Sequence, residues 1–219
     1  MDEENFSIDE EEIKNETKDT VNQVKDSIKN SDFKTNVNET KGLIKDLILS
    51  PIEAVKRAAN GEENLLPKAI ILMIAFIVAY LGYNMSTIAT TVKFSTKIFR
   101  IIISIIYPVL YVAVPAFMVL LLNKKNKKPL IRNICTMVVV SVPEIVGYLV
   151  IILGTLINGI TVLTQPVATA LSALTIILMY FGIKELLGEE DEKKAVTKFI
   201  VIKLVTAFVL LLLLRIKPF

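Results

Sequence analysis

The stretch that decides the fold runs from Asn133 to Ile183 and reads NICTMVVVSVPEIVGYLVIILGTLINGITVLTQPVATALSALTIILMYFGI. Within its 51 residues, Glu144 is the only charged side chain. A helix that crosses about 30 Å of hydrocarbon, at about 1.5 Å per residue, needs about 20 residues. The stretch is therefore long enough for two membrane spans, and the Asn158-Gly159 pair predicts the tight turn between them.

Similar apolar runs continue on both sides of this stretch. The chain has 219 residues, 53% of them hydrophobic, which is more than ordinary soluble domains contain. The sequence predicts an all-α, polytopic membrane helix bundle with about five transmembrane helices and a mostly disordered N-terminal tail. The predicted spans, which together form a domain over residues 65–214, cover residues 65–83, 101–122, 134–157, 160–181 and 195–214.

The N-terminal tail differs in composition from the rest of the chain. Residues 1–45 carry 12 acidic and 7 basic side chains, whereas the remaining residues carry 10 acidic and 18 basic ones. Residues 1–40 contain too few apolar side chains to offset the entropy of ordering, so they are expected to form a disordered cytoplasmic tail. Val21, Val24 and Ile28 have the spacing of a coiled-coil seam, so the start of a coiled coil is the alternative to a disordered or loosely helical tether.

Residues 41–64 have the pattern of two amphipathic surface helices. Leu43, Ile44, Leu47 and Ile48 share one face of the first helix. The sequence Ser50-Pro51-Ile52-Glu53 is typical of a capping box with proline at the first helical position, so a second helix should run from Pro51 to about Asn60-Gly61. This pair could bind the membrane surface, or it could only lead the chain into the bilayer.

The distribution of basic residues predicts the orientation. With the N-terminus in the cytoplasm, the cytoplasmic flanks of the spans hold 12 Lys and Arg residues and the outer flanks hold 5. This places residues 215–219 outside as a short tail. Abundant Lys, Asn and Ile favour an AT-rich bacterial genome, so the expected location is a bacterial plasma membrane.

Because these bases lie at span ends, we expect them to meet anionic lipid headgroups rather than nucleic acid. The candidate lipid-contacting residues are Lys56, Arg57, Lys124, Lys125, Lys127 and Lys128.

Several kinds of chemistry are disfavoured by what the chain lacks. It contains no histidine, no G-x-G pattern and no P-loop, so no catalytic, cofactor-binding or metal-binding residue is predicted. Cys135 has no second cysteine with which to form a disulfide. The acidic run at residues 189–192 lacks the ligand spacing of a calcium loop and is expected to be a solvated loop.

Glu144 is an acidic side chain near the middle of a predicted span. A charged side chain near the middle of a membrane costs at least about 2.5 to 3.5 kcal/mol, so Glu144 needs water, a partner or a proton. Pro143 removes a backbone hydrogen bond and should kink the helix next to it. Lys203 is the closest candidate cation, but it is expected to extend toward the cytoplasmic face. Glu144 could have a proton- or ion-linked role, or it could be a neutral acid that is hydrogen-bonded inside the bundle.

Two further patterns concern helix shape and packing. Pro108, Pro115 and Pro166 lie inside predicted spans, where each can kink its helix. Ala168 with Ser172, and Thr169 with Ala173, form small-residue pairs four positions apart. One face of the fourth span can therefore pack closely on another helix, and packing within the chain is favoured over dimerisation.

The order of these features resembles the Ypt-interacting protein (Yip) domain family, especially its prokaryotic branch. The features are a polar tail, a short helix at Ser50 to Ala54, five spans, a basic second loop, and the proline of Ser141-Val142-Pro143 in the third span. The resemblance covers about residues 46–214. In eukaryotes it implies membrane proteins that contact Rab-type GTPases and one another, with no known enzymatic chemistry. The Asp-Leu-Tyr-Gly-Pro stretch typical of the family is absent here, so Rab contact is not carried over.

Two functions follow as hypotheses. The first is a non-enzymatic scaffold or trafficking-type adaptor that organises the membrane, with protein partners or copies of itself bound to it. The second is a small transporter or channel subunit that uses Glu144 and the kinked spans. We favour the first, because a single intramembrane acid is thin evidence for a transport pathway.

Overall fold

The computed structural model describes residues 10–30, 32–61, 64–86, 94–123, 128–157 and 161–215. Every regular element in these ranges is a helix. Their bounds are α1 Glu10–Asn30, α2 Phe33–Leu49, α3 Pro51–Asn60, α4 Leu66–Ser86, α5 Phe94–Leu122, α6 Leu130–Val140, α7 Val142–Leu156, α8 Thr161–Leu187 and α9 Glu192–Arg215.

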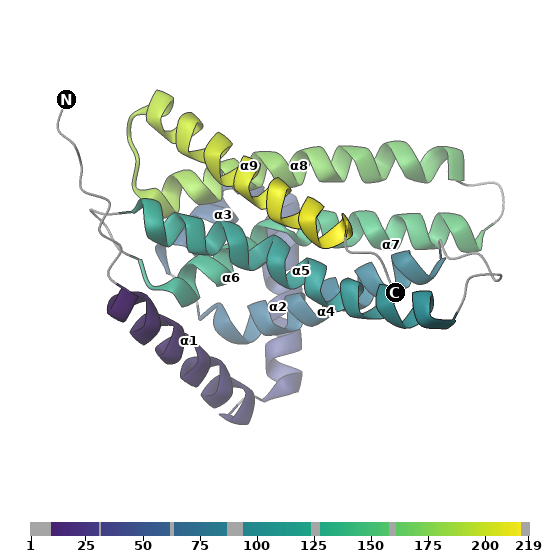
Figure 1. The fold of residues 1–219 in the computed structure, drawn as a ribbon, viewed down its shortest axis with the longest axis horizontal. Coiled ribbons are helices and arrows are strands. Elements are labelled where there is room, and N and C mark those ends of the chain that lie inside the picture. The colour runs from purple at the N-terminus through teal and green to yellow at the C-terminus, as the bar shows by residue number, and fades with distance from the viewer. Residues whose placement is uncertain are drawn as a thin grey trace.

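The prediction of five spans is confirmed. Five helical stretches are long and apolar enough to cross a membrane: Leu66–Ser86, Thr96–Leu122, Leu130–Leu156, Val162–Leu187 and Glu192–Arg215. The third of these contains both α6 and α7. In Figure 1 these helices run roughly side by side, with α7 along α8 and α9 crossing α5. The predicted turn at Asn158-Gly159 lies outside the described residues.

Because the spans alternate in direction, α4, α6 and α9 begin at the same end of the bundle at which α5 and α8 finish. Helix α3 packs on α6 and α8 at this end. We refer to it as the α3 end.

Residues 33–60 form two packed helices. Asp32 begins α2 by accepting a hydrogen bond from the backbone N–H of Lys34 at 3.1 Å. Helix α3 begins at Pro51 as predicted, but the Ser50 side chain makes no capping bond. Ser50 also ends α2, where its N–H donates to the Asp46 carbonyl at 2.8 Å. Gly61 then ends α3 with φ of 73°, a conformation that glycine adopts without strain.

The buried face of α3 consists of Ala54, Val55, Ala58 and Ala59. It packs on α6 and α8. Gly182 of α8 makes this approach possible, since a Cβ added there would lie 3.3 Å from Val55 Cγ1. The apolar face of α3 is therefore satisfied by protein and not by lipid.

Within the N-terminal tail, residues 10–30 form a helix. The Glu16 carboxylate accepts a hydrogen bond at 3.1 Å from the backbone N–H of Leu130, the first residue of α6. A carboxylate at this position satisfies a donor that would otherwise have no intrahelical partner, and it complements the helix dipole. Val21 and Ile28 remain 47% and 58% exposed, so the predicted seam does not pack as a whole.

Candidate functional site

Glu144 lies in the first turn of α7 and faces α8. The hydroxyl of Ser172 donates a hydrogen bond to Glu144 Oε2 at 2.7 Å. The side chain is half-buried, beside a cavity of about 170 Å³ between α7 and α8. The intramembrane acid therefore has a hydrogen-bond partner within the bundle.

The helix break predicted at Pro143 is present. Helix α6 ends at Val140 and α7 begins at Val142, with Ser141 between them. Pro143 has no N–H to continue the α-helical ladder, and the N–H of Ser141 instead donates to the Val138 carbonyl at 3.1 Å. The break places Glu144 at the start of a new helical segment inside the third span.

An aromatic cluster lies next to this site. Five of the six tyrosines in the chain belong to it, together with Phe76: Tyr80 and Tyr83 of α4, Tyr107 and Tyr111 of α5, and Tyr148 of α7. The rings of Tyr80 and Tyr107 stack with centroids 4.4 Å apart, and those of Tyr80 and Tyr148 meet edge to face at 5.1 Å. The cluster joins three spans by contacts that aromatic rings favour.

Our sequence analysis missed this cluster, although it leaves a signal. Tyr80 and Tyr83 are three residues apart, Tyr107 and Tyr111 are four apart, and Tyr148 lies four residues after Glu144. Each pair falls on one face of its helix. Helical spacing alone could not show that these faces meet.

The extension of Lys203 toward the cytoplasmic face stays a prediction, and the structure places its half-buried side chain against α5. Its Nζ lies 5.7 Å from the centroid of the Tyr111 ring, within the range of a cation–π interaction. This contact with the ring offsets part of the cost of burying the ammonium group.

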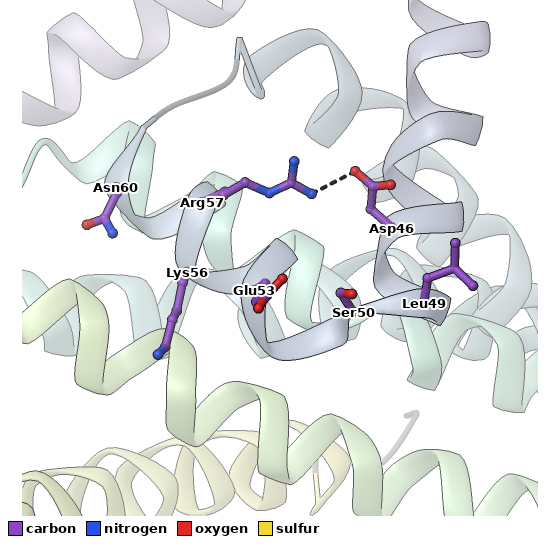
Figure 2. A pocket seen from close by; sticks show the side chains of 7 residues that line it. All are labelled: Asp46, Leu49, Ser50, Glu53, Lys56, Arg57 and Asn60. Carbon is purple, nitrogen blue, oxygen red and sulfur yellow. Dashed lines mark hydrogen bonds and ion pairs between the residues drawn. The ribbon is translucent and has the colours of Figure 1, made fainter.

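A second candidate site is a pocket between α2 and α3, with a volume of about 620 Å³. Its lining includes two acids, Asp46 and Glu53, and two bases, Lys56 and Arg57, so its formal charge sums to zero. Arg57 pairs with Asp46 at 2.7 Å, and Figure 2 shows Lys56 pointing away from this ion pair. Ile48 and Leu49, next to Ser50, are 75% and 68% exposed.

The predicted lipid-contacting bases have different environments. Lys124, Lys125 and Lys127 lie outside the described residues. Arg57 is already paired with an acid, and Lys56 is exposed. Of the three bases that the structure describes, Arg57 and Lys128 are thus engaged by protein groups.

Lys128 is bound to the backbone at the α3 end. Its Nζ donates to the main-chain oxygens of Ala59 at 3.1 Å and Glu185 at 2.9 Å, and to Asn60 Oδ1 at 3.1 Å. Burial lowers the pKa of Lys128, an effect that the nearby Glu185 carboxylate opposes. A lysine is well suited to this position, because the last carbonyls of a helix lack intrahelical partners. Lys128 therefore joins the C-terminal ends of α3 and α8.

The acidic run between α8 and α9 makes local contacts. Glu189 pairs with Lys198 at 2.7 Å, and Glu192 pairs with Lys184 and accepts a hydrogen bond from the Tyr180 hydroxyl. Asp191 accepts from the N–H of Lys193 at 2.9 Å at the start of α9. Across the ranges that the structure describes, no group of three or more His, Cys, Asp or Glu side chains is arranged to hold a metal ion.

Five apolar spans with helices packed at one end define a multi-pass integral membrane protein. The family model for the Yip1 domain matches residues 45–214, and the chain therefore belongs to the Yip1 domain family. This confirms the resemblance inferred from the order of spans and prolines. No curated protein and no solved structure matches the chain significantly.

Proposed function

We propose that this protein is a non-enzymatic membrane adaptor that holds a docking face, formed by α2 and α3, on a five-span anchor. The observation that supports this function best is the seating of α3 between α6 and α8. Val55 is fully buried there, and Lys128 hydrogen-bonds the C-terminal ends of both α3 and α8. A surface fixed to the spans in this way would present a partner at a constant distance from the bilayer.

The bias of basic residues supports a cytoplasmic location for the α3 end. In this proposal the protein lies in a bacterial plasma membrane, with its N-terminus in the cytoplasm and its C-terminus outside. Anionic headgroups would then surround Lys56, whose side chain is exposed near the pocket.

The α2–α3 pocket suits a protein segment better than an anionic headgroup. The negative charges of its two acids balance the positive charges of its two bases, and Arg57 is already paired with Asp46. The exposed side chains of Ile48 and Leu49 add apolar area beside these charges. Apolar contacts combined with polar groups of both signs are typical of protein interfaces.

Photocross-linking in intact cells tests this proposal. A photoreactive amino acid at Leu49 should give one discrete protein adduct, and Lys56→Glu should weaken it by changing the charge of the pocket. The matched control carries the same amino acid at Leu153, which is 56% exposed on a span and should contact lipid alone. If the adducts at Leu49 and Leu153 were the same, or if Lys56→Glu left the Leu49 adduct unchanged, the docking face would be rejected.

A second candidate function is a small transporter or channel subunit. The observation that favours it is the presence of two ionisable side chains, Glu144 and Lys203, inside the spans, because such side chains often belong to transport pathways. The cavity beside Glu144 is small, about 170 Å³, and its lining comes from α7 and α8 alone. We therefore place this function second.

Proteoliposomes with an internal pH-sensitive dye separate the two functions. The adaptor proposal predicts that wild-type protein and Glu144→Gln will both resemble empty liposomes. A proton-linked flux that is present in the wild type and lost in Glu144→Gln would establish the transporter function instead.

A further inference from the structure

The cavity beside Glu144 is lined by hydrogen-bonding groups from both helices. Glu144 and Tyr148 come from α7, and Gln165, Thr169 and Ser172 come from α8. Gln165 and Thr169 are exposed, so this crevice opens on the outer surface of the helix pair. Since α7 and α8 belong to the apolar spans, that surface would face acyl chains in a bilayer.

The crevice contains an acidic side chain but no basic one. Glu144 is the only carboxyl group among its lining residues, and no lysine or arginine lines it. Lys203 lies over Tyr111 and does not line the crevice. The crevice therefore offers one carboxyl group, with amide and hydroxyl oxygens around it, to a hydrogen-bond donor.

Its depth and size limit what can enter. Glu144 lies near the middle of the Leu130–Leu156 span, so a ligand must be able to cross hydrocarbon to reach it. A volume of about 170 Å³ holds roughly five or six groups the size of a water molecule. Beside the crevice the two helices lie close together, since a Cβ added at Gly147 would be 3.7 Å from the Ala168 carbonyl oxygen, an ordinary van der Waals contact.

We propose that this crevice binds the amino group of an alkylamine, an amphiphile that enters sideways from the bilayer. The amine crosses the hydrocarbon uncharged, because an unpaired ammonium there would be costly. At the crevice the O–H bond of the Glu144 carboxyl group breaks and a new N–H bond forms on the amine. The products are an ammonium and a carboxylate, so the total charge stays at zero and no other reactant is needed.

The surrounding groups would stabilise this pair. Ser172 already donates to Glu144 Oε2 and would orient the carboxylate toward the ligand. The hydroxyl of Thr169 and the amide oxygen of Gln165 can accept hydrogen bonds from the ammonium, which has three donors. The alkyl chain would lie along the exposed apolar side chains of the spans.

Native mass spectrometry and tyrosine fluorescence together test this site. Protein in uncharged phosphatidylcholine nanodiscs is titrated with dodecylamine, and with dodecanol and dodecanoate as probes of the same chain length. Because the chain has no tryptophan and Tyr148 lines the crevice, a change in tyrosine emission reports occupancy. The expected result is one retained dodecylamine per chain. Dodecanol and dodecanoate should each bind at least about tenfold more weakly.

The variants distinguish a site from simple partitioning into lipid. Glu144→Gln should weaken dodecylamine binding about tenfold or more, and Thr169→Phe should reduce it by blocking the opening without touching the acid. Leu153→Ala, a lipid-facing change on the same helix, should have no effect. Equal retention of all three probes, or equal binding by wild type and both crevice variants, would overturn the proposal. Either result would leave the adaptor function unaffected, because that function concerns the α3 end.

Discussion

Val55 of α3 packs against Gly182 of α8, although 126 residues separate them in the chain. A Cβ at position 182 would lie 3.1 Å from Val140 Cγ1 and 3.3 Å from Val55 Cγ1, which is closer than most such contacts. The absence of a side chain at Gly182 is therefore a condition for seating α3, and this relationship gives the first prediction.

Gly182→Leu should displace α3 and lower thermal stability in detergent, because there is no space for the added atoms. Overpacking of this kind typically costs about 1 to 3 kcal/mol. Gly42→Ala is the matched control, since nothing lies within 4 Å of a Cβ at Gly42 and alanine favours the helix. Fluorescence-detected size-exclusion chromatography after heating measures both. Equal stability of Gly182→Leu and wild type would show that α3 is not held at this position.

Two glycines of α7 should respond differently to alanine. A Cβ at Gly154 would lie 2.3 Å from Thr164 Oγ1 and 2.9 Å from Thr164 Cβ, so rotating the threonine cannot relieve the clash. At Gly147 the nearest atom would be 3.7 Å away. Gly154→Ala should therefore lower the melting temperature, and Gly147→Ala should leave it unchanged or raise it slightly. If both variants melted alike, the described approach of α7 to α8 at Gly154 would be wrong.

Lys128→Met should destabilise the α3 end. The substitution removes donors from the main-chain oxygens of Ala59 and Glu185, and leaving buried acceptors unsatisfied costs about 1 to 3 kcal/mol. Lys56→Met removes a charge of the same sign from an exposed side chain and serves as the control. Thermal unfolding of both variants provides the measurement. If Lys56→Met lowered the melting temperature as much as Lys128→Met, the change in net charge would be the cause, and not the loss of these hydrogen bonds.

The ion pair between Glu189 and Lys198 should depend on pH in a defined direction. The hydrogen bond from Lys198 lowers the pKa of Glu189 below its usual value of 4.5. A carboxyl group whose pKa is lower in the folded state contributes stability above its unfolded pKa, and this contribution is lost as the pH falls through the folded pKa. Wild type should thus melt above Glu189→Gln at pH 7, and the difference should disappear in acid. A difference that stayed constant down to pH 2 would contradict the pairing.

The orientation can be tested with a reporter that is active only outside the cytoplasm. The excess of basic residues at the α3 end predicts that this reporter will be silent when fused after Asn126 and active when fused after Asn158. The reverse pattern would invert the proposed topology, and the α2–α3 docking face would then lie outside the cell.

The sequence predicts the spans well because span length and apolar content follow from the bilayer itself. The predicted span at residues 134–157 and the observed Leu130–Leu156 differ by only a few residues at each end. The break at Pro143 was also predictable, since it follows from the missing N–H of a single residue.

The packing of α3 and the tyrosine cluster could not be predicted in the same way. The apolar face of α3 is equally suited to lipid and to protein, and the sequence does not show that Gly182 leaves space for it. Tyr80, Tyr107 and Tyr148 lie on three different helices, and their meeting depends on how those helices rotate about their axes. The position of Lys203 depends on the same rotation, because Tyr111 attracts its ammonium group only once α5 and α9 are packed.

The seating of α3 also constrains the order of biosynthesis. The ribosome releases Ala54 and Val55 long before it has made Gly182, so α3 lacks its α8 partner while the first three spans are being inserted. During that interval the part of the α3 face that α8 later covers would be shielded by lipid or by an insertion factor. A chain that stalls before the fourth span would leave that part uncovered, providing a mark by which a membrane protease could distinguish incomplete molecules from finished ones.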